Sequence, residues 1–158
     1  MKLNQDEIGR LYQQHGRGLI AYACSFVRDF ASGEDVVHQV FERLLRGHIT
    51  IEGSPASYLY AAVRNAALNH HRNNSRDVEL GNVWLEGPPG TEEVAVILQS
   101  VLLELPPEQR EVVILRIWGQ MTFDEIGTTV GVPVKTAESR YRYGLQKLRE
   151  AMRPVTKG

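Results

Sequence analysis

The sequence predicts an all-α fold made of two small helical domains joined by a flexible linker. Apolar residues recur with the 3.6-residue period of a helix over most of the chain, and no segment shows the alternation typical of a strand. The periodicity is lost at residues 74–91, where Gly and Pro gather. A chain of 158 residues has room for one ordinary domain or two small ones. We therefore expect domains at residues 1–76 and 92–153, with a linker at 77–91.

Three helices are expected in the first domain. The first carries apolar residues on one side through residues 19–30. Ser32 and Asp35 fit a capping box, which would start the second helix. An apolar stripe through residues 36–45 then follows on that helix. Ser54 and Pro55 are a favourable N-cap and first residue for the third helix.

The second domain is expected to end in a helix-turn-helix. Pro106–Pro107 ends one helix and opens the next. Thr122 and Glu125 form a capping box at the start of a short helix, and Gly131 breaks it. Pro133 then opens a final basic helix. A short helix, a turn containing glycine and a basic helix are typical of DNA-binding domains.

Composition indicates a globular, water-soluble chain, with 42% apolar and 23% charged residues. We expect no membrane insertion and a cytoplasmic location, because no apolar run approaches a membrane span and the N-terminus lacks a signal peptide. The single cysteine, Cys24, excludes an intramolecular disulfide and a cysteine-rich zinc site. It lies in an apolar stretch, so we interpret it as a small core residue.

Charge is divided along the chain, although the net charge is only −1. Residues 77–111 carry eight acidic side chains and one base, whereas residues 133–153 carry six bases and two acids. Residues 64–76 hold three arginines, two histidines and no acid. Two basic segments separated by an acidic one suggest two nucleic-acid contacts. The alternative, two solvated helix faces, is left open by charge alone.

The last helix has a polar, mainly basic face opposite an apolar one. In a helix-turn-helix the second helix enters the major groove, where arginine can bridge guanine O6 and N7. An ordinary amphipathic helix ending a bundle is the alternative. We expect these residues to contact DNA: Lys135, Thr136, Glu138, Ser139, Arg140, Arg142, Tyr143 and Lys147.

The segment LPPEQREVVILRIWGQMTFDEIGTTVGVPVKTAESRYRYGLQKLRE, at residues 105–150, resembles region 4 of bacterial sigma factors. The resemblance implies that this half binds the promoter's minus-35 element and the flap of the polymerase β subunit. Apolar residues from Val112 to Trp118 would divide between the core and the flap contact. Glu138 stands where the family commonly has a base, so the minus-35 sequence preferred by other members cannot be carried over.

The segment GEDVVHQVFERLL, at residues 33–45, resembles sigma region 2.2, which docks on the clamp coiled coil of the polymerase β′ subunit. Gln39 replaces a frequent glutamate, which would weaken one charged contact. Asp35 could instead cap its helix, and both roles can coexist. The resemblance implies that these residues bind core polymerase: Asp35, His38, Gln39, Phe41, Glu42 and Arg43.

The segment SPASYLYAAVRNAALNHHRNNSR, at residues 54–76, resembles the part of region 2 that binds and opens the minus-10 element. In the family the preceding loop forms a pocket for a flipped base, and we expect His48, Ile49 and Ser54 to shape a weaker one. A metal site at His70 and His71 is not expected, because adjacent helical residues diverge and no carboxylate or cysteine stands at ligand spacing. The minus-10 candidates are His48, Ile49, Ser54, Tyr58, Arg64, Asn65, His70, His71 and Arg72.

Both resemblances together identify the chain as similar to the extracytoplasmic-function (group 4) sigma factors of the sigma-70 family. They imply an alternative sigma factor that binds core RNA polymerase and promoter DNA and is controlled by an anti-sigma factor. A stand-alone helix-turn-helix regulator with an N-terminal sensing or dimerisation domain is the alternative. No catalytic, metal-ligand or phosphate-loop spacing stands out, so we expect neither an enzyme nor a cofactor.

Overall fold

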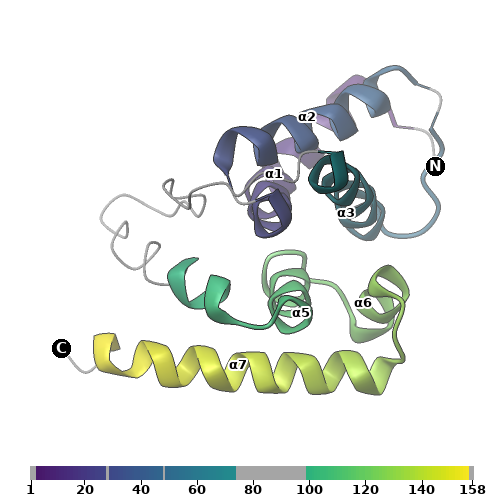
Figure 1. Cartoon of the computed structure of the whole chain (residues 1–158). Coiled ribbons are helices and arrows are strands. Elements are labelled where there is room, and N and C mark those ends of the chain that lie inside the picture. Colours follow the sequence, from purple (N-terminus) through teal and green to yellow (C-terminus); the bar gives the residue numbers. More distant parts are fainter. Residues whose placement is uncertain (1–2, 28, 48, 74–98, 157–158) are drawn as a thin grey trace. The chain divides into compact units, whose positions relative to one another are not determined.

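The computed structural model describes residues 3–27, 29–47, 49–73 and 99–156 (Figure 1). All regular structure in these ranges is helical, and the chain forms two compact units, Met1–Asn82 and Val83–Gly158. The all-α, two-domain fold is therefore confirmed. The linker expected at residues 77–91 lies outside the described residues, so the bounds of the domains stay a prediction.

In the first unit, α1 (Gln5–Val27) is the central helix and packs against both α2 and α3. Asn4 and Glu7 cap its start reciprocally: the Glu7 amide donates to Asn4 Oδ1 at 2.8 Å and the Asn4 amide to Glu7 Oε1 at 3.3 Å. Every residue from Gly18 to Ser25 is buried. A helix buried all round needs neighbours on both sides, which α2 and α3 provide.

The helix α2 (Phe30–Leu45) begins earlier than the sequence predicted. Asp29 is the N-cap, because its Oδ1 accepts a hydrogen bond from the Ser32 amide at 2.9 Å. The capping box at Ser32 and Asp35 is therefore wrong, and Phe30 belongs to α2 rather than to the end of α1. Asp35 lies in the second turn of α2, where no free backbone amide remains for it to cap.

The helix α3 (Pro55–Asn73) starts where the sequence predicted. The Ser54 hydroxyl accepts from the Ser57 amide at 3.4 Å, and Pro55 occupies the first helical position. Leu59, Tyr60 and Val63 point into the core. The ring of Tyr60 lies 5.4 Å from that of Tyr22 on α1, which joins the two helices.

In the second unit a helical segment at 99–104 precedes α5 (Pro107–Ile117). Arg110 is only 4% exposed and ties the two together. Its guanidinium donates to the carbonyl oxygens of Leu102 at 2.9 Å, Leu103 at 3.2 Å and Leu105 at 3.1 Å. These carbonyls lie at the end of the preceding helix, where the Leu102 carbonyl also accepts from the Leu105 amide at 3.2 Å, and Arg110 fixes the turn into α5.

The helix-turn-helix consists of α6 (Phe123–Val130) and α7 (Val134–Thr156). Both halves of the predicted capping box are present, with the Glu125 amide donating to Thr122 Oγ1 at 3.1 Å and the Thr122 amide to Glu125 Oε1 at 2.9 Å. Gly131 ends α6 at φ 78°, a conformation that favours glycine. The predicted capping box and helix stop are thus confirmed.

The core of the second unit lies where α5 and α6 pack on α7, with Val112, Val113, Ile126 and Ala137 wholly buried. Gly144 brings α7 close to α5, because a β-carbon there would lie 2.8 Å from Val113 Cγ2. Within the described ranges, none of the helices combines the length and hydropathy that a membrane span requires.

Candidate nucleic-acid and partner interfaces

The polar residues singled out on α2 share its solvent-facing side. Asp35, His38, Gln39 and Glu42 recur at three- and four-residue spacing and are exposed, with Arg43 at the edge of the same face. Phe41 differs, since only 5% of it is exposed. Phe41 therefore packs in the core beneath this face, while its polar neighbours carry hydrogen-bonding groups that are open to a partner.

An apolar hollow of about 540 Å³ adjoins this face. Tyr12 forms one wall: its hydroxyl lies 3.1 Å from His38 Nε2, and its ring meets Phe41 edge-on at 5.1 Å between centroids. Tyr12 is 37% and Leu45 52% exposed. The hollow, here called the α1–α2 slot, is lined by Gln5, Ile8, Gly9, Tyr12, Gln13, His38, Phe41, Glu42 and Leu45.

The sequence did not reveal the α1–α2 slot. Leu45 was placed on the inward stripe of its helix, but it is exposed at the end of α2. Tyr12 lies 26 residues before His38, and no local spacing shows that they meet. An apolar hollow with polar neighbours can receive an apolar side chain from a partner helix.

The candidate minus-10 residues do not form one cluster. Tyr58 and Asn65 are seven residues apart on α3 and share one side of it, with Tyr58 half-buried and Asn65 exposed. Half-buried Arg64 lies towards one flank, whereas half-buried His70 follows Val63 by seven residues on the core-facing side. Ile49 and Ser54 are half-buried in the preceding segment, where Ser54 caps α3. His48 and the side chains of His71 and Arg72 lie outside the described residues.

Two neighbours of these residues belong to the core instead. Tyr60 is fully buried, its hydroxyl has no hydrogen-bond partner, and burial raises the pKa of its phenol. Ile51 is 1% exposed and anchors the segment before α3. Tyr60 therefore cannot stack on a base, although it is part of the resemblance to region 2.

No group of three His, Cys, Asp or Glu side chains that could hold a metal ion occurs among the described residues. Cys24 is fully buried, and burial together with the nearby Asp29 and Glu34 carboxylates raises the pKa of its thiol to about 12. The thiol is directed at the Asp29 carbonyl oxygen, 3.6 Å away. Cys24 is a core residue, as the sequence predicted.

All eight candidate minus-35 residues lie outside the buried stripe of Ala137, Gly144 and Leu148 on α7; five are exposed, and Thr136, Ser139 and Arg140 are half-buried. Helical spacing divides them between two flanks of the helix. Thr136, Arg140 and Lys147 lie on the flank nearer α5, whereas Glu138 and Arg142 lie on the other. The two flanks therefore differ in charge, because Glu138 is the one acid among these eight residues.

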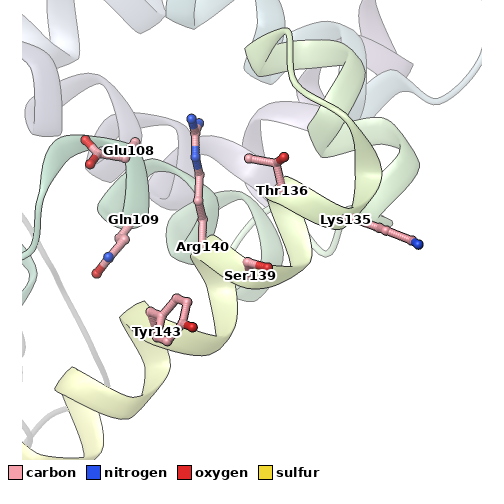
Figure 2. A pocket seen from close by; sticks show the side chains of 7 residues that line it. All are labelled: Glu108, Gln109, Lys135, Thr136, Ser139, Arg140 and Tyr143. Atoms are coloured by element: carbon pink, nitrogen blue, oxygen red, sulfur yellow. The ribbon is translucent and has the colours of Figure 1, made fainter.

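A hollow of about 420 Å³ separates the first turn of α5 from the first half of α7 (Figure 2). Figure 2 shows Glu108 on α5 and Arg140 on α7 extending in different directions, while Lys135 points away from both. Sequence reasoning missed Glu108 and Gln109, which belonged to an acidic segment with no sign of a site. The hollow, here called the α5–α7 pocket, is lined by Glu108, Gln109, Lys135, Thr136, Ser139, Arg140 and Tyr143.

The apolar residues of α5 and its end that were expected to divide between core and flap contact differ in how far their side chains are exposed. Val112, Val113 and Leu115 are wholly buried. Ile117 is 43% exposed and Trp118 half-buried at the end of α5. An exposed apolar end of this kind offers a surface for a partner, while the valines hold the domain together.

Two family models match the chain in the order of these interfaces: Sigma-70 region 2 at residues 11–77 and Sigma-70, region 4 at residues 101–150. The chain is 30% identical over 142 residues to the RNA polymerase sigma-E factor of Streptomyces coelicolor, covering 85% of this chain and 79% of that protein. It is 26% identical over 151 residues to the ECF RNA polymerase sigma factor SigL of Mycobacterium tuberculosis, covering 88% and 85%.

Solved structures share the fold at lower identity. The sigma factor RpoE in complex with the anti-sigma factor NepR, from Bartonella quintana, superposes with a TM-score of 0.76 at 18% identity, covering 95% of this chain and 98% of that one. CnrH in complex with the cytosolic domain of CnrY gives a TM-score of 0.68 at 22% identity, covering 96% and 90%.

Proposed function

The chain belongs to the extracytoplasmic-function group of the sigma-70 family, and on that premise we propose how its surfaces divide the work of an alternative sigma factor. Such a factor binds core RNA polymerase and directs it to particular promoters. The observation that carries the assignment is the presence of both sigma regions in one chain. A stand-alone regulator has no need of region 2, so this match favours the sigma factor.

The exposed side of α2 and the adjoining α1–α2 slot anchor core polymerase. Asp35 and Glu42 offer carboxylates and Gln39 an amide on one surface, which suits a polar, partly basic partner helix. The slot adds apolar area, and apolar side chains buried near the centre of an interface supply most of its affinity. The partner on this side is the clamp coiled coil of the β′ subunit, and the exposed end of α5 meets the β flap.

Promoter DNA is bound by both units. The exposed side of α7 reads the minus-35 element as duplex, while Tyr58 and Asn65 on α3 meet the opened strand of the minus-10 element. Stacking of a base on an aromatic ring contributes roughly 1–3 kcal/mol, which offsets the unstacking of that base. The same proposal includes the remaining minus-10 candidates. It also includes domains at 1–76 and 92–153, joined by a linker at 77–91.

An anti-sigma factor holds this sigma factor inactive until its promoters are needed. Support comes from one structure of the same fold, in which a sigma factor is in complex with the anti-sigma factor NepR. The chain works in the cytoplasm with the polymerase, and it acts by binding rather than as an enzyme. Members of its family are DNA-binding initiation factors.

Reversing charges on the α2 surface tests the anchoring role. The variant Asp35→Arg/Glu42→Arg changes two exposed carboxylates, and the surface ion pair between Glu42 and Arg46 that it removes contributes at most about 1 kcal/mol. We expect the intact chain to co-elute with bacterial core RNA polymerase on size exclusion and the variant to elute alone.

Glu104→Arg/Glu150→Arg is the matched control, because it makes the same charge change at exposed positions of the second unit. It should co-elute with core polymerase as the natural chain does. Failure of the intact chain to bind core polymerase would contradict the sigma-factor assignment. Equal binding by both variants would contradict only the anchoring role of α2.

A further inference from the structure

The α5–α7 pocket opens on the DNA-facing side of the second unit. Five of its seven lining residues are candidate minus-35 contacts on α7, and the other two come from the first turn of α5. DNA bound along the first half of α7 therefore also meets Glu108 and Gln109. Glu108 is exposed, so its carboxylate is free to face DNA across the pocket from Arg140 (Figure 2).

The first turn of α5 is held rigidly in this position. Arg110 binds three backbone carbonyls before α5. On the other side α7 approaches so closely that a β-carbon at Gly144 would lie 3.4 Å from Gln109 Cβ and 3.5 Å from the Gln109 carbonyl oxygen. These contacts hold the backbone of the first turn of α5 beside α7.

We propose that Glu108 is a specificity-determining residue of the DNA interface. Its carboxylate repels phosphate and therefore weakens the binding of DNA that is contacted through its phosphates alone. Non-specific binding comes from phosphate contacts and is the same in every register along the duplex. The Glu108 carboxylate, which lines the same pocket as Arg140, weakens binding in all such registers. A hydrogen bond donated to the carboxylate by a base amino group offsets this repulsion, and cytosine N4 is the amino group best matched to a carboxylate.

The size of the effect follows from the charge. A unit charge roughly 6 Å from a phosphate in water changes the affinity by about threefold. Glu108→Gln should therefore bind a duplex of random sequence about threefold more tightly at low ionic strength. In selection from randomised duplexes, the natural chain should enrich cytosine at one position, and the variant should lose that preference.

The inference rests on the proposed function only in taking α7 as the DNA-reading helix. The experiment measures fluorescence anisotropy of a labelled random-sequence duplex with the full chain. Glu104→Gln is the control, since it removes the same charge in the same unit outside the pocket. It should change the affinity by less than half as much as Glu108→Gln.

Two outcomes overturn the inference while leaving the DNA-binding face intact: equal effects of Glu108→Gln and Glu104→Gln, or an unchanged base preference after selection. Arg140→Gln tests the face itself and should weaken binding of the same duplex. If Arg140→Gln binds as tightly as the natural chain, the assignment of this side of α7 to DNA is wrong, and the inference falls with it.

Discussion

Gly33 on α2 packs closely against Cys24 on α1, and a double-mutant cycle there tests the packing of the first unit. A β-carbon at Gly33 would overlap the Cys24 sulfur and lie 3.3 Å from the Cys24 backbone nitrogen. Both residues are buried. Gly33→Ala therefore adds a methyl group where the facing helix leaves no room.

Two opposed effects set the sign of the change in stability. Alanine is favoured over glycine in a helix by about 1 kcal/mol. Overpacking a filled core destabilises by roughly 1–3 kcal/mol. With the sulfur in place, overpacking should win, and Gly33→Ala should destabilise by about 1 kcal/mol. In a Cys24→Ala background the sulfur is gone, so Gly33→Ala should become neutral or stabilising, a coupling of about 1–2 kcal/mol.

The assay is denaturant unfolding of the full chain, followed by far-UV circular dichroism and by tryptophan fluorescence. In a Trp84→Phe background the remaining tryptophan is Trp118, at the end of α5 in the second unit, so a transition seen by dichroism alone reports the first unit. Gly9→Ala is the control, since no atom lies within 4 Å of a β-carbon there. It should stabilise by about 1 kcal/mol, the helix preference alone.

Additivity would refute this reasoning. If Gly33→Ala has the same effect with and without the Cys24 sulfur, within about 0.5 kcal/mol, the two residues do not limit the approach of α1 and α2. A stabilising Gly33→Ala in the natural background would show that the helices separate at little cost. In either case the helix crossing would be looser than the structure indicates.

Three further changes probe single residues. Cys24 should react with a thiol reagent at pH 8 about a thousandfold more slowly in the native than in the unfolded chain, since its pKa rises from 9.0 to about 12. Equal reactivity in both states would contradict its burial. Because the folded pKa is the higher, this thiol's contribution to stability should fall as pH rises from 9 towards 12. Arg110→Met should destabilise the second unit by roughly 2–4 kcal/mol, because it removes the side-chain donor of three carbonyls, of which Leu102 keeps the Leu105 amide. The measurement is tryptophan fluorescence on unfolding, and a loss below about 1 kcal/mol would show that water replaces the guanidinium. In Gly127→Ala a β-carbon would lie 2.7 Å from the Val132 carbonyl oxygen, so the turn between α6 and α7 should shift. Duplex DNA should then bind at least tenfold more weakly, as measured by fluorescence anisotropy. Unchanged binding would show that the turn is not rigid.

The sequence by itself determined the class of fold and several helix ends. Ser54–Pro55, the Thr122–Glu125 capping box and Gly131 act where they were expected. Each such signal is a contact between residues about three apart, so neighbouring letters contain all of it. The error at Ser32 had the same local origin, because Asp29 offers an equally good cap three residues earlier. The resemblance to two sigma regions added the family, which the comparisons confirmed.

Only the tertiary structure decided which of the singled-out residues reach solvent and what lies beside them. Phe41 was expected to contact polymerase, but its side chain is buried and meets Tyr12 on α1, just as Tyr60 is buried against Tyr22. Tyr12 meets His38, and Glu108 meets the first half of α7, across 26 or more residues of sequence. Helical periodicity gives the face of a helix on which a residue lies. Which residue of another helix it contacts depends on how the two helices cross, and the crossing is set by the close packing of side chains from both helices.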